Sequence, residues 1–451
     1  MNNTLESIAE KLLSMSKKFG SEQADVTVSK GSIISIEVRE GKLEQAEGSN
    51  GLAIALRVIN DQKSAIVSCT DDNLESLEQI AKKANEIANE SIPNPFIGLA
   101  ENNELFTKSS KLTSSDLSEP DEIILKDPHK LKTVAIKAEK ANLGSAGILK
   151  TDGSSASASH SEHFLATSTG FSNGYKRSSY TVFSSAISIN NDKMEREHAF
   201  EQRTYFGDLP PPETIGELAA ERAKMMRGAK KPSTGNYPVI FNERISVSIV
   251  GHILSAINGE AITRGSSWLL DCMDKKILPE KINLIEDPHL PRMSGSRSFD
   301  SEGLSTTKNS FIQNGVLKSW ILDLKTSRQL GLKSTGNAKR SGSSPPSPGV
   351  GNVELTGGFN TLNQLIDNAG EGLMVCSLIG SSINQNNGDY SRGITGFWFK
   401  DGVITHAVNE CTIAGNLKEM IKTMILANDS KSHLSRRVPS ILVNNMMIAG
   451  N

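Results

Sequence analysis

The chain has 451 residues, which at about 150 residues per domain predicts roughly three structural units with cores of their own. Lysine and arginine total 49 and aspartate and glutamate total 51, so a net charge of -2 offers no basic field for nucleic acid or anionic lipid. Only 5% of the residues are aromatic, which is few for a protein that stacks single-stranded bases. The composition argues against nucleic acid as a partner.

The cysteines and the N-terminus bear on the compartment. Cys69, Cys272, Cys376 and Cys411 are widely separated and form no CxxC motif, which is typical of reduced thiols in a cytoplasmic protein. The first residues lack a basic start followed by an apolar run, so no secretory signal is expected. No stretch approaches the roughly 18 apolar residues of a membrane-spanning helix. We therefore expect a soluble cytoplasmic protein that does not associate with membranes.

The first unit, residues 1–106, has the pattern of a two-layer α+β domain. Apolar residues at helical spacing predict a helix over 4–19, and a second helix is predicted over 74–87. Between them, period-2 patterns predict strands of an antiparallel sheet. The breaks between these strands are expected at Lys30-Gly31, Gly41-Lys42 and Asn60-Asp61.

The middle region, residues 107–230, is predicted to be a helix followed by a β-meander. A Ser-rich stretch at 100–120 is expected to be a linker, and Asp127-Pro128 then has the pattern of a helix start. The following segment has no helical periodicity, and we expect hairpin turns in it at Asp152-Gly153 and Asn173-Gly174.

The last unit, residues 231–451, is predicted to be a β-rich domain with one unusual helix. The segment 243–258 is apolar on nearly every side, which indicates a helix that is buried or covered by a partner. A hairpin turn is expected at Asn314-Gly315, and strands around 372–378 and 396–405. The expected fold class is α+β, with an N-terminal helix and antiparallel-sheet unit followed by a larger β-rich C-terminal domain.

Two short motifs, one typical of metal binding and one of serine hydrolases, lie in segments whose predicted structure does not support these functions. The eight histidines form no HExxH or HExxxH, and His160 and His163 point to opposite faces of a predicted strand, so two ligands to one ion are not expected there. Gly170–Gly174 matches GxSxG, but no helical pattern follows Ser172, as a nucleophile elbow would need. A hairpin turn is the favoured interpretation, and a serine hydrolase acting through Ser172 is the weakest alternative.

Three further sites each have two interpretations. His252, in the apolar helix, is either functional with a perturbed pKa or a core histidine with satisfied nitrogens, which is the commoner case. Asp300 and Glu302 form either a catalytic or cation-binding pair or, as such acids beside glycine more often do, a turn. Cys376 lies in an apolar strand pattern, which favours a buried thiol over a reactive one. The residues by themselves complete no catalytic constellation.

Longer motifs in the last unit are similar to a known family. Residues 386–398 (NNGDYSRGITGFW) and 410–417 (ECTIAGNL) resemble the C-terminal signature of the TldD/PmbA family, and specifically its PmbA (TldE) branch. Residues 261–270 (AITRGSSWLL), 299–303 (FDSEG) and 334–338 (STGNA) agree with it. The resemblance covers nearly the whole chain.

This resemblance implies one subunit of a two-chain metallopeptidase that degrades or processes unfolded peptides. In such a pair the TldD-type subunit carries HExxxH on a helix and a late cysteine as zinc ligands. At the matching helix positions this chain has Gly251, His252 and Ala256, and its last cysteine, Cys411, lies in a strand pattern. Since a zinc site needs at least three protein ligands, we expect no catalytic residue, metal or cofactor in this chain, and zinc in the partner.

The role left to this chain would be substrate binding and contact with a TldD-type partner in a heterodimer, or with a second copy when it is alone. An unfolded peptide would most simply be held by β-augmentation. The candidate substrate-binding residues are His252, Gly380, Tyr390, Arg392 and Gly393, although glycines are more often ordinary turn residues. The alternative function is a non-enzymatic peptide-binding or regulatory adaptor that acts as a homodimer.

Overall fold

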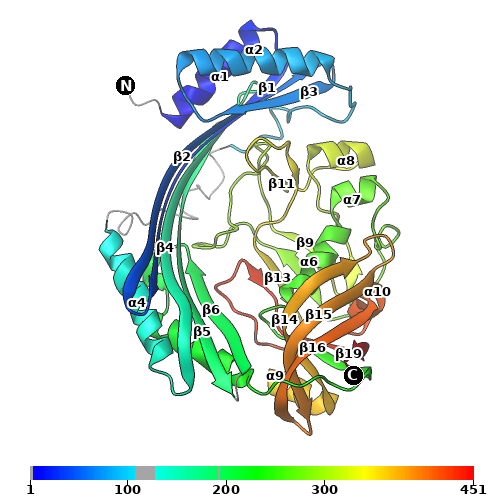
Figure 1. The fold of residues 1–451 in the computed structure, drawn as a ribbon. Helices are drawn as coiled ribbons and strands as arrows, with labels where there is room; N and C mark the ends of the chain where they lie inside the picture. The colour runs from blue at the N-terminus through cyan, green and yellow to red at the C-terminus, as the bar shows by residue number, and fades with distance from the viewer. Residues whose placement is uncertain (1–3, 108–126, 191–192, 451) are drawn as a thin grey trace.

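The computed structural model describes residues 4–107, 127–190 and 193–450, and it shows a long curved sheet that faces a β-rich C-terminal domain (Figure 1). The α+β class expected from the sequence is confirmed. The elements of the first half of the chain are α1 (Leu5–Lys18), β1 (Gln23–Arg39), β2 (Lys42–Asn60), β3 (Lys63–Cys69), α2 (Leu74–Glu90), α4 (Pro128–Leu143), β4 (Ile148–Thr167), β5 (Ser172–Asn190), β6 (Lys193–Arg203), the 3-10 turn η1 (Phe206–Asp208) and α5 (Pro212–Met225).

One antiparallel sheet, in the order β3-β2-β1-β4-β5-β6, passes through both of the first two predicted units. Four of its strands are 17 to 20 residues long, well beyond the usual 3–10. The break predicted at Lys30-Gly31 is wrong, because Gly31 pairs with Gly51 on one side and with Ser161 on the other. Pairing with neighbouring strands on both sides keeps Gly31 within β1.

The two faces of the sheet differ because side chains alternate along each strand. One face is covered at one end by α1 and α2, which pack on Val26, Val28 and Leu56. At the other end α4 and α5 cover Val182 and Ala186. The opposite face is turned toward the C-terminal domain, and the sheet curves around that domain with its helices on the outside (Figure 1).

Two predicted hairpin turns lie within strands instead. Asp152-Gly153 forms a bulge in β4, where the register with β5 shifts between Thr151 and Ser154 and Gly153 has a φ of +117°. Asn173-Gly174 is part of β5 and pairs with Leu165 and Phe164, so the turn lies just before it. The neighbouring strands extend the hydrogen-bonded ladder past residues that favour turns.

Most of the predicted linker, from residue 108 onward, lies outside the described residues.

The C-terminal domain is built on a closed sheet. Strands β16, β15, β14, β7 and β19 follow one another, and β16 also pairs with β19. A second sheet has the order β10-β9-β8-β13-β18. The elements are β7 (Gly235–Phe241), α6 (Val247–Ala256), α7 (Gly259–Thr263), β8 (Asn283–Glu286), β9 (Asn309–Gln313), β10 (Val316–Leu317), α8 (Leu324–Leu330), β11 (Ala338–Lys339), β12 (Ser347–Pro348), β13 (Val353–Thr356), α9 (Leu362–Ala369), β14 (Glu371–Ile383), β15 (Asp389–Lys400), β16 (Val403–Asn416), α10 (Leu417–Lys422), β17 (Ile425–Leu426), β18 (Arg436–Arg437) and β19 (Ile441–Ala449).

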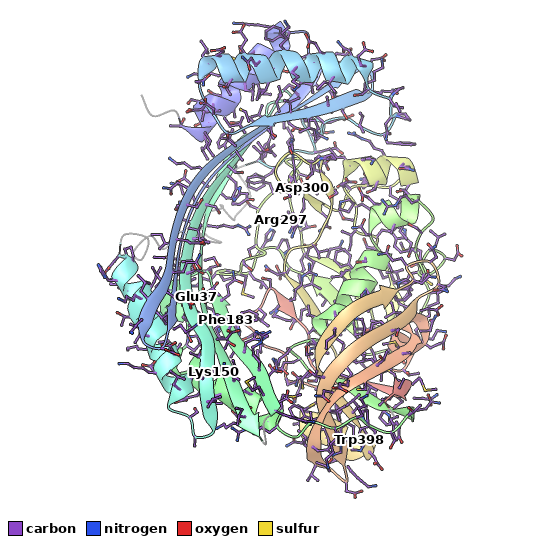
Figure 2. All side chains as sticks on the ribbon, in the orientation of Figure 1. Glu37, Lys150, Phe183, Arg297, Asp300 and Trp398 are labelled. Atoms are coloured by element: carbon purple, nitrogen blue, oxygen red, sulfur yellow. The ribbon has the colours of Figure 1, made fainter. Side chains whose placement is uncertain are left out.

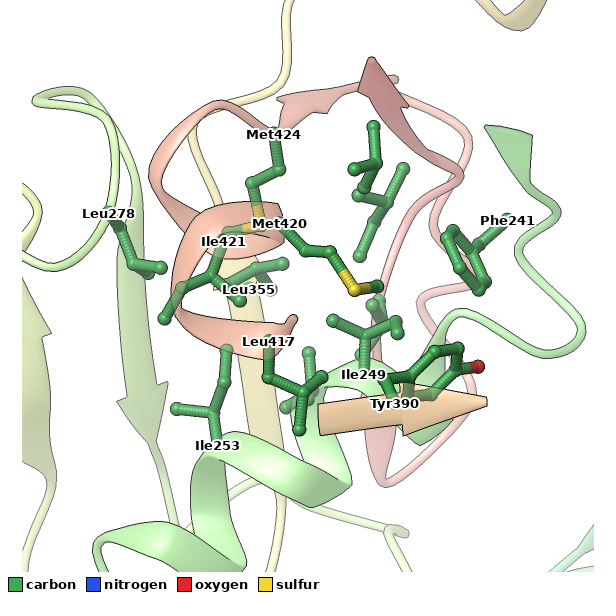
Figure 3. Packing of buried hydrophobic residues seen from close by; sticks show 14 of the residues in the cluster. Phe241, Ile249, Ile253, Leu278, Leu355, Tyr390, Leu417, Met420, Ile421 and Met424 are labelled. Carbon is green, nitrogen blue, oxygen red and sulfur yellow. The ribbon is translucent and has the colours of Figure 1, made fainter. Parts of the chain in front are cut away.

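Helix α6 is shorter than predicted and is buried on one side only. Ile249, Val250 and Ile253 are at most 1% exposed and belong to the main core, where α10 and β15 surround them (Figure 3). Ser255 is exposed and His252 is half-buried. The predicted turn at Asn314-Gly315 does connect β9 and β10. Within the described ranges, no helix has the length and apolar character needed to cross a bilayer.

Candidate functional site

The open face of the long sheet and the C-terminal domain enclose two cavities of about 1200 and 700 Å³, called here the large and the small cavity. Strand β5 contributes to both. Tyr175 and Arg177 line the small cavity, whereas Ser179 and Phe183 line the large one. All four have odd numbers and therefore lie on one face of the strand. Ser294 of the C-terminal domain lines both cavities, so the two are neighbours along β5.

The large cavity is bordered by a free strand edge. β6 is the last strand of its sheet, and its outer edge pairs with no other strand in the part of the chain that the structure describes. Arg222 donates to the carbonyl of His198 at 2.9 Å, and Arg203 donates to the carbonyl of Gln202 at 2.8 Å. These carbonyls therefore point away from β5. Because the register between β5 and β6 is regular, the backbone groups of Phe200, between them, point outward as well.

Aromatic rings form a platform beside this edge. The ring of His198 stacks on Phe183 at 5.7 Å and lies parallel to Phe200 at 6.5 Å between centroids. Phe200 is 57% exposed, and Ile379, which lines the same cavity from β14, is 58% exposed. Figure 2 places Phe183 on the side of the sheet toward the C-terminal domain. Such exposed apolar groups along a cleft are typical of binding surfaces.

Polar contacts connect β6 to the opposite wall of the large cavity. Arg244 forms an ion pair with Glu197 at 3.3 Å, and His433 Nε2 lies 3.3 Å from a carboxylate oxygen of Glu201, although burial lowers the pKa of His433. Cys376 lies in the same wall, and burial raises the pKa of its thiol to about 12. The thiol is therefore protonated at neutral pH, in agreement with the interpretation of Cys376 as a buried, unreactive cysteine.

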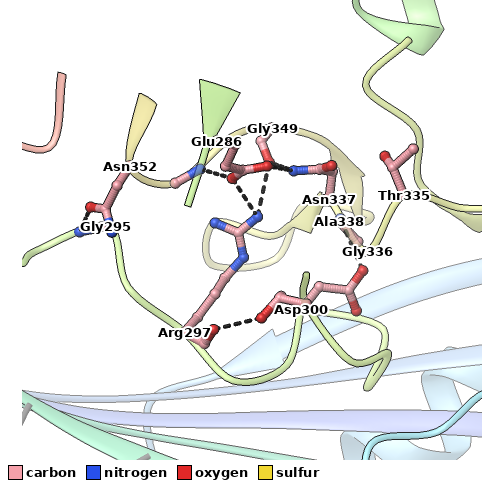
Figure 4. A network of polar contacts seen from close by, with 12 residues as sticks. Glu286, Gly295, Arg297, Asp300, Thr335, Gly336, Asn337, Ala338, Gly349 and Asn352 are labelled. Atoms are coloured by element: carbon pink, nitrogen blue, oxygen red, sulfur yellow. Dashed lines mark hydrogen bonds and ion pairs between the residues drawn. The ribbon is translucent and has the colours of Figure 1, made fainter. Parts of the chain in front are cut away.

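The small cavity is lined by four cationic side chains, and its wall is organised by a buried glutamate (Figure 4). Glu286 accepts hydrogen bonds from Arg297 at 3.1 Å, from Asn337 at 2.6 Å and from the backbone amide of Gly351. The cationic side chains of the cavity are Arg177, Arg297, Lys339 and Arg340.

Asp300 and Glu302 form a turn, as the sequence favoured. Asp300 accepts backbone hydrogen bonds from Glu302 at 2.9 Å, Leu304 at 3.0 Å and Ala338 at 3.0 Å. Burial raises the pKa of Asp300 to about 6. Burial and the neighbouring Asp300 raise the pKa of Glu302 well above its usual range. The Asp300 carboxylate thus holds the backbone of this loop, whereas Glu302 accepts a hydrogen bond from the backbone amide of Leu324 at 2.8 Å.

The candidates from the sequence lie apart from both cavities. The rings of His252 and Tyr390 meet edge to face at 5.9 Å. Burial and Arg392 lower the pKa of His252, and burial raises the pKa of Tyr390 to about 12. Among the described residues, His252 Nε2, the Tyr390 hydroxyl and Arg392 Nε have no hydrogen-bond partner. Gly380 is exposed on β14, and Gly393 pairs with Ile379.

The positions that the motif resemblance aligns with a metal-binding helix all lie on α6. Gly251 faces open space, whereas Ala256 is 3% exposed. Burial raises the pKa of Cys411, on β16, to about 11. His163 exchanges hydrogen bonds with Ser29 at 2.9 Å and Ser161 at 3.1 Å. Over the described residues, no group of three or more His, Cys, Asp or Glu side chains could hold a metal ion.

The four cations of the small cavity and the free edge of β6 were not predicted from the sequence. Arg177 on β5 lies more than 100 positions before the other three cations, which belong to the C-terminal domain. One local pattern pointed to the cleft: Tyr175, Arg177 and Ser179 alternate with the buried Ser178 and Tyr180, which marks a strand with one polar face.

Three family models match the chain in sequence. Residues 24–88 match the PmbA/TldA metallopeptidase domain 1, residues 120–227 its central domain and residues 234–450 its C-terminal domain. Each match lies inside one of the three predicted ranges. The boundary between the first two matches separates β1–β3 from β4–β6, although β1 and β4 pair within one sheet.

Curated relatives match over almost the whole chain. Metalloprotease PmbA of Escherichia coli O157:H7 is 33% identical over 95% of this chain and 93% of its own length. The Metalloprotease PmbA homolog of Haemophilus influenzae is 32% identical over 95% of this chain and 92% of its own.

Two solved structures share the fold. A putative modulator of DNA gyrase from Bacteroides thetaiotaomicron superposes with a TM-score of 0.90 at 24% identity, over 99% of this chain and 100% of that one. TldE from Thermococcus kodakarensis superposes with a TM-score of 0.84 at 23% identity, over 98% and 99%. Together with the sequence matches, these findings confirm the resemblance noted from the motifs: the chain belongs to the PmbA/TldD metallopeptidase family, in its PmbA (TldE) branch.

Proposed function

We propose that the chain is the metal-free, peptide-holding subunit of a two-chain cytoplasmic metallopeptidase. An unfolded peptide would lie in the large cavity against the free edge of β6, and a TldD-type partner would supply zinc and the cleavage chemistry. The observation that carries this proposal is the outward-facing backbone of β6, which borders a cavity of about 1200 Å³.

Backbone pairing suits a peptidase that accepts unfolded chains of many sequences. A peptide strand added to β6 would bond to the outward amide and carbonyl of Phe200, and main-chain hydrogen bonds do not depend on the side chains of the substrate. The carbonyls of His198 and Gln202 already accept one side-chain donor each. A carbonyl has two lone pairs, so each can accept a second bond from the peptide.

The walls of the cavity would then contact side chains of the peptide. The ring platform of Phe183, His198 and Phe200 lies on one side, and Ile379 lies on the other. Burying the exposed parts of Phe200 and Ile379 would add roughly 25 cal/mol for each Å² of apolar surface removed from water. The apolar contacts would therefore strengthen binding, while the backbone would set the direction of the peptide.

The residues on α6 support the absence of metal chemistry from this subunit. Gly251 and Ala256 stand where the family resemblance places zinc ligands, and neither side chain has an atom that can coordinate an ion. Only His252 could do so, and its ring contacts that of Tyr390 edge to face, outside the residues that line either cavity. One imidazole is two ligands short of a catalytic zinc site.

The test is to measure zinc content and cleavage of an unfolded, fluorogenic protein substrate for three samples: this chain, a TldD-type chain of the same genome, and the two mixed. We expect stoichiometric zinc only in the TldD-type chain and strong cleavage only in the mixture. Cleavage by this chain alone at the rate of the mixture would overturn the proposal. Peptide binding with no gain in cleavage on mixing would favour the adaptor function instead.

A further inference from the structure

The small cavity, beside the proposed peptide cleft, collects more positive than negative charge. Arg177 reaches it from β5, Arg297 from the loop before Phe299, and Lys339 and Arg340 from the end of β11. Its lining acid, Asp300, is already bonded to three backbone amides. The cations of the long sheet and of the C-terminal domain thus meet in one place.

Several guanidinium nitrogens here have no partner among the described residues. Arg297 has a side chain only 9% exposed, and although its Nη2 pairs with Glu286, its Nε and Nη1 are unpaired. Arg340 has a side chain 3% exposed, and its Nη1 pairs with Asp25 at 2.5 Å while Nη2 is unpaired. The Nε of Arg177 is unpaired as well, whereas its Nη1 and Nη2 donate to the carbonyls of Ser294 and Ser296. A buried donor without an acceptor is costly, so such a group of donors indicates the place of an oxyanion.

Lys339 completes this group. Its side chain is exposed to the cavity and lies along the backbone of Gly349. Burial and the neighbouring charges of Arg297 and Arg436 lower the pKa of Lys339 to about 8. Glu286 and Asp25 pair with Arg297 and Arg340, but Lys339 has no carboxylate partner of its own among the ion pairs of the described residues, so repulsion by the guanidinium groups is the expected result. An anion in the cavity would relieve this repulsion.

The shape and place of the cavity restrict the anion. Its volume of about 700 Å³ is far more than an inorganic ion fills and lies in the range of organic ligands. Tyr175 and Phe299 add aromatic walls that suit an amino-acid side chain, and Ser294 is shared with the large cavity. A guanidinium group often makes bidentate contact with a carboxylate. The combination matches the end of a peptide rather than a free ion.

We propose that the small cavity binds the carboxylate of a peptide, its C-terminal group, while the preceding residues lie along β6 in the large cavity. This inference rests on the proposed function. The chain would thus recognise the C-terminus of its peptide substrate. Arg297 and Lys339 would contact the carboxylate, and Arg177 and Arg340 would contribute positive charge from the wall of the cavity. Tyr175 and Phe299 would surround the last side chain.

The test measures the affinity of the full-length chain for an unfolded peptide labelled at its N-terminus, by fluorescence anisotropy, with the peptide either as a free acid or as a C-terminal amide. We expect the free acid to bind at least about tenfold more tightly than the amide, since charge-assisted bonds are lost with the carboxylate. Lys339→Gln should weaken binding of the free acid and leave the amide unchanged. Lys333→Gln, which removes an exposed lysine of the same domain, is the matched control and should change neither.

A second variant separates geometry from charge. Arg297→Lys keeps the positive charge but loses the planar fork, and it should also reduce the preference for the free acid. Its melting temperature and circular dichroism establish that the variant is folded. Excess acetate should compete with the free acid more strongly than with the amide.

The outcomes are distinct. Equal affinities for the two peptides would overturn the carboxylate inference and leave the proposed peptide-holding function intact. Binding of neither peptide would overturn both. Equal affinities for the peptides together with tight binding of inorganic phosphate, lost in Lys339→Gln, would assign the cavity to a phosphate ligand and contradict the inference.

Discussion

Replacing Asp25 by asparagine should destabilise the protein more than any single exposed charge does. The Asp25 carboxylate on β1 lies 2.5 Å from Arg57 on β2 and 2.5 Å from Arg340 of the C-terminal domain. The three side chains are 2%, 8% and 3% exposed. Asparagine keeps the shape but leaves two buried guanidinium groups without their counter-ion. Breaking a buried ion pair in this way costs about 3–5 kcal/mol.

The assay is equilibrium urea unfolding, followed by circular dichroism, at neutral pH. Asp152→Asn is the matched control, because Asp152 also faces two arginines, Arg39 and Arg196, but is 42% exposed. Exposed pairs contribute about 0–1 kcal/mol, so the control should lose little stability. Equal losses for Asp25→Asn and Asp152→Asn would refute the reasoning.

The same substitution predicts a pH dependence. Although burial opposes ionisation, Arg57 and Arg340 lower the pKa of Asp25 below its ordinary value. A carboxyl group with a lowered pKa stabilises the fold above its unfolded pKa and loses that contribution as the pH falls through the folded value. The stability difference between the wild type and Asp25→Asn should therefore shrink in acid. A difference that grows on acidification would contradict the assignment.

Three further predictions concern the core and one turn. The raised pKa of Glu302 means that the folded state resists ionisation of this carboxyl group. The gain in melting temperature of Glu302→Gln over the wild type should therefore be larger at pH 8 than at pH 5. An equal difference between the two proteins at both pH values would contradict this. Ile253→Ala, at 0% exposure on α6, should cost about 2–5 kcal/mol in urea unfolding, whereas Ser255→Ala on the exposed face should cost under about 0.5; equal costs would place α6 outside the core. Gly315 has a φ of +79° and its added Cβ would collide with the carbonyl of Leu278, so Gly315→Ala should lower the melting temperature clearly, and an unchanged value would contradict the turn geometry.

The helices and the fold class followed from local patterns. The helices α1 and α2 have amphipathic spacing, and α4 begins at the predicted Asp127-Pro128 cap. These features depend on residues within one or two turns of each other, which a sequence displays directly. The motifs of the last unit were long enough to identify the family as well.

The extent of the strands and the make-up of the site depend on partners far away in the sequence, which local patterns reveal only in part. Gly31 and Asn173-Gly174 favour turns locally, yet both stay in strands because neighbouring strands supply the hydrogen bonds. Similarly, the cations Arg177 and Arg297 meet only because β5 faces the C-terminal domain. The candidates His252, Tyr390 and Arg392 do come together, but beside the core of one domain and away from the cleft between the two.

The most direct test of the peptide-holding role compares Phe200→Pro with Phe200→Ala. Proline removes the outward amide of the β6 edge without touching the bonds to β5, since edge strands tolerate proline where the amide faces solvent. Alanine removes the same ring and keeps the amide. The measurement is the KM for an unfolded peptide in the mixture with a TldD-type chain. The proposed function predicts a KM that rises severalfold more for Phe200→Pro than for Phe200→Ala, with both variants folded. Equal KM values for the two variants would show that the peptide does not pair with β6.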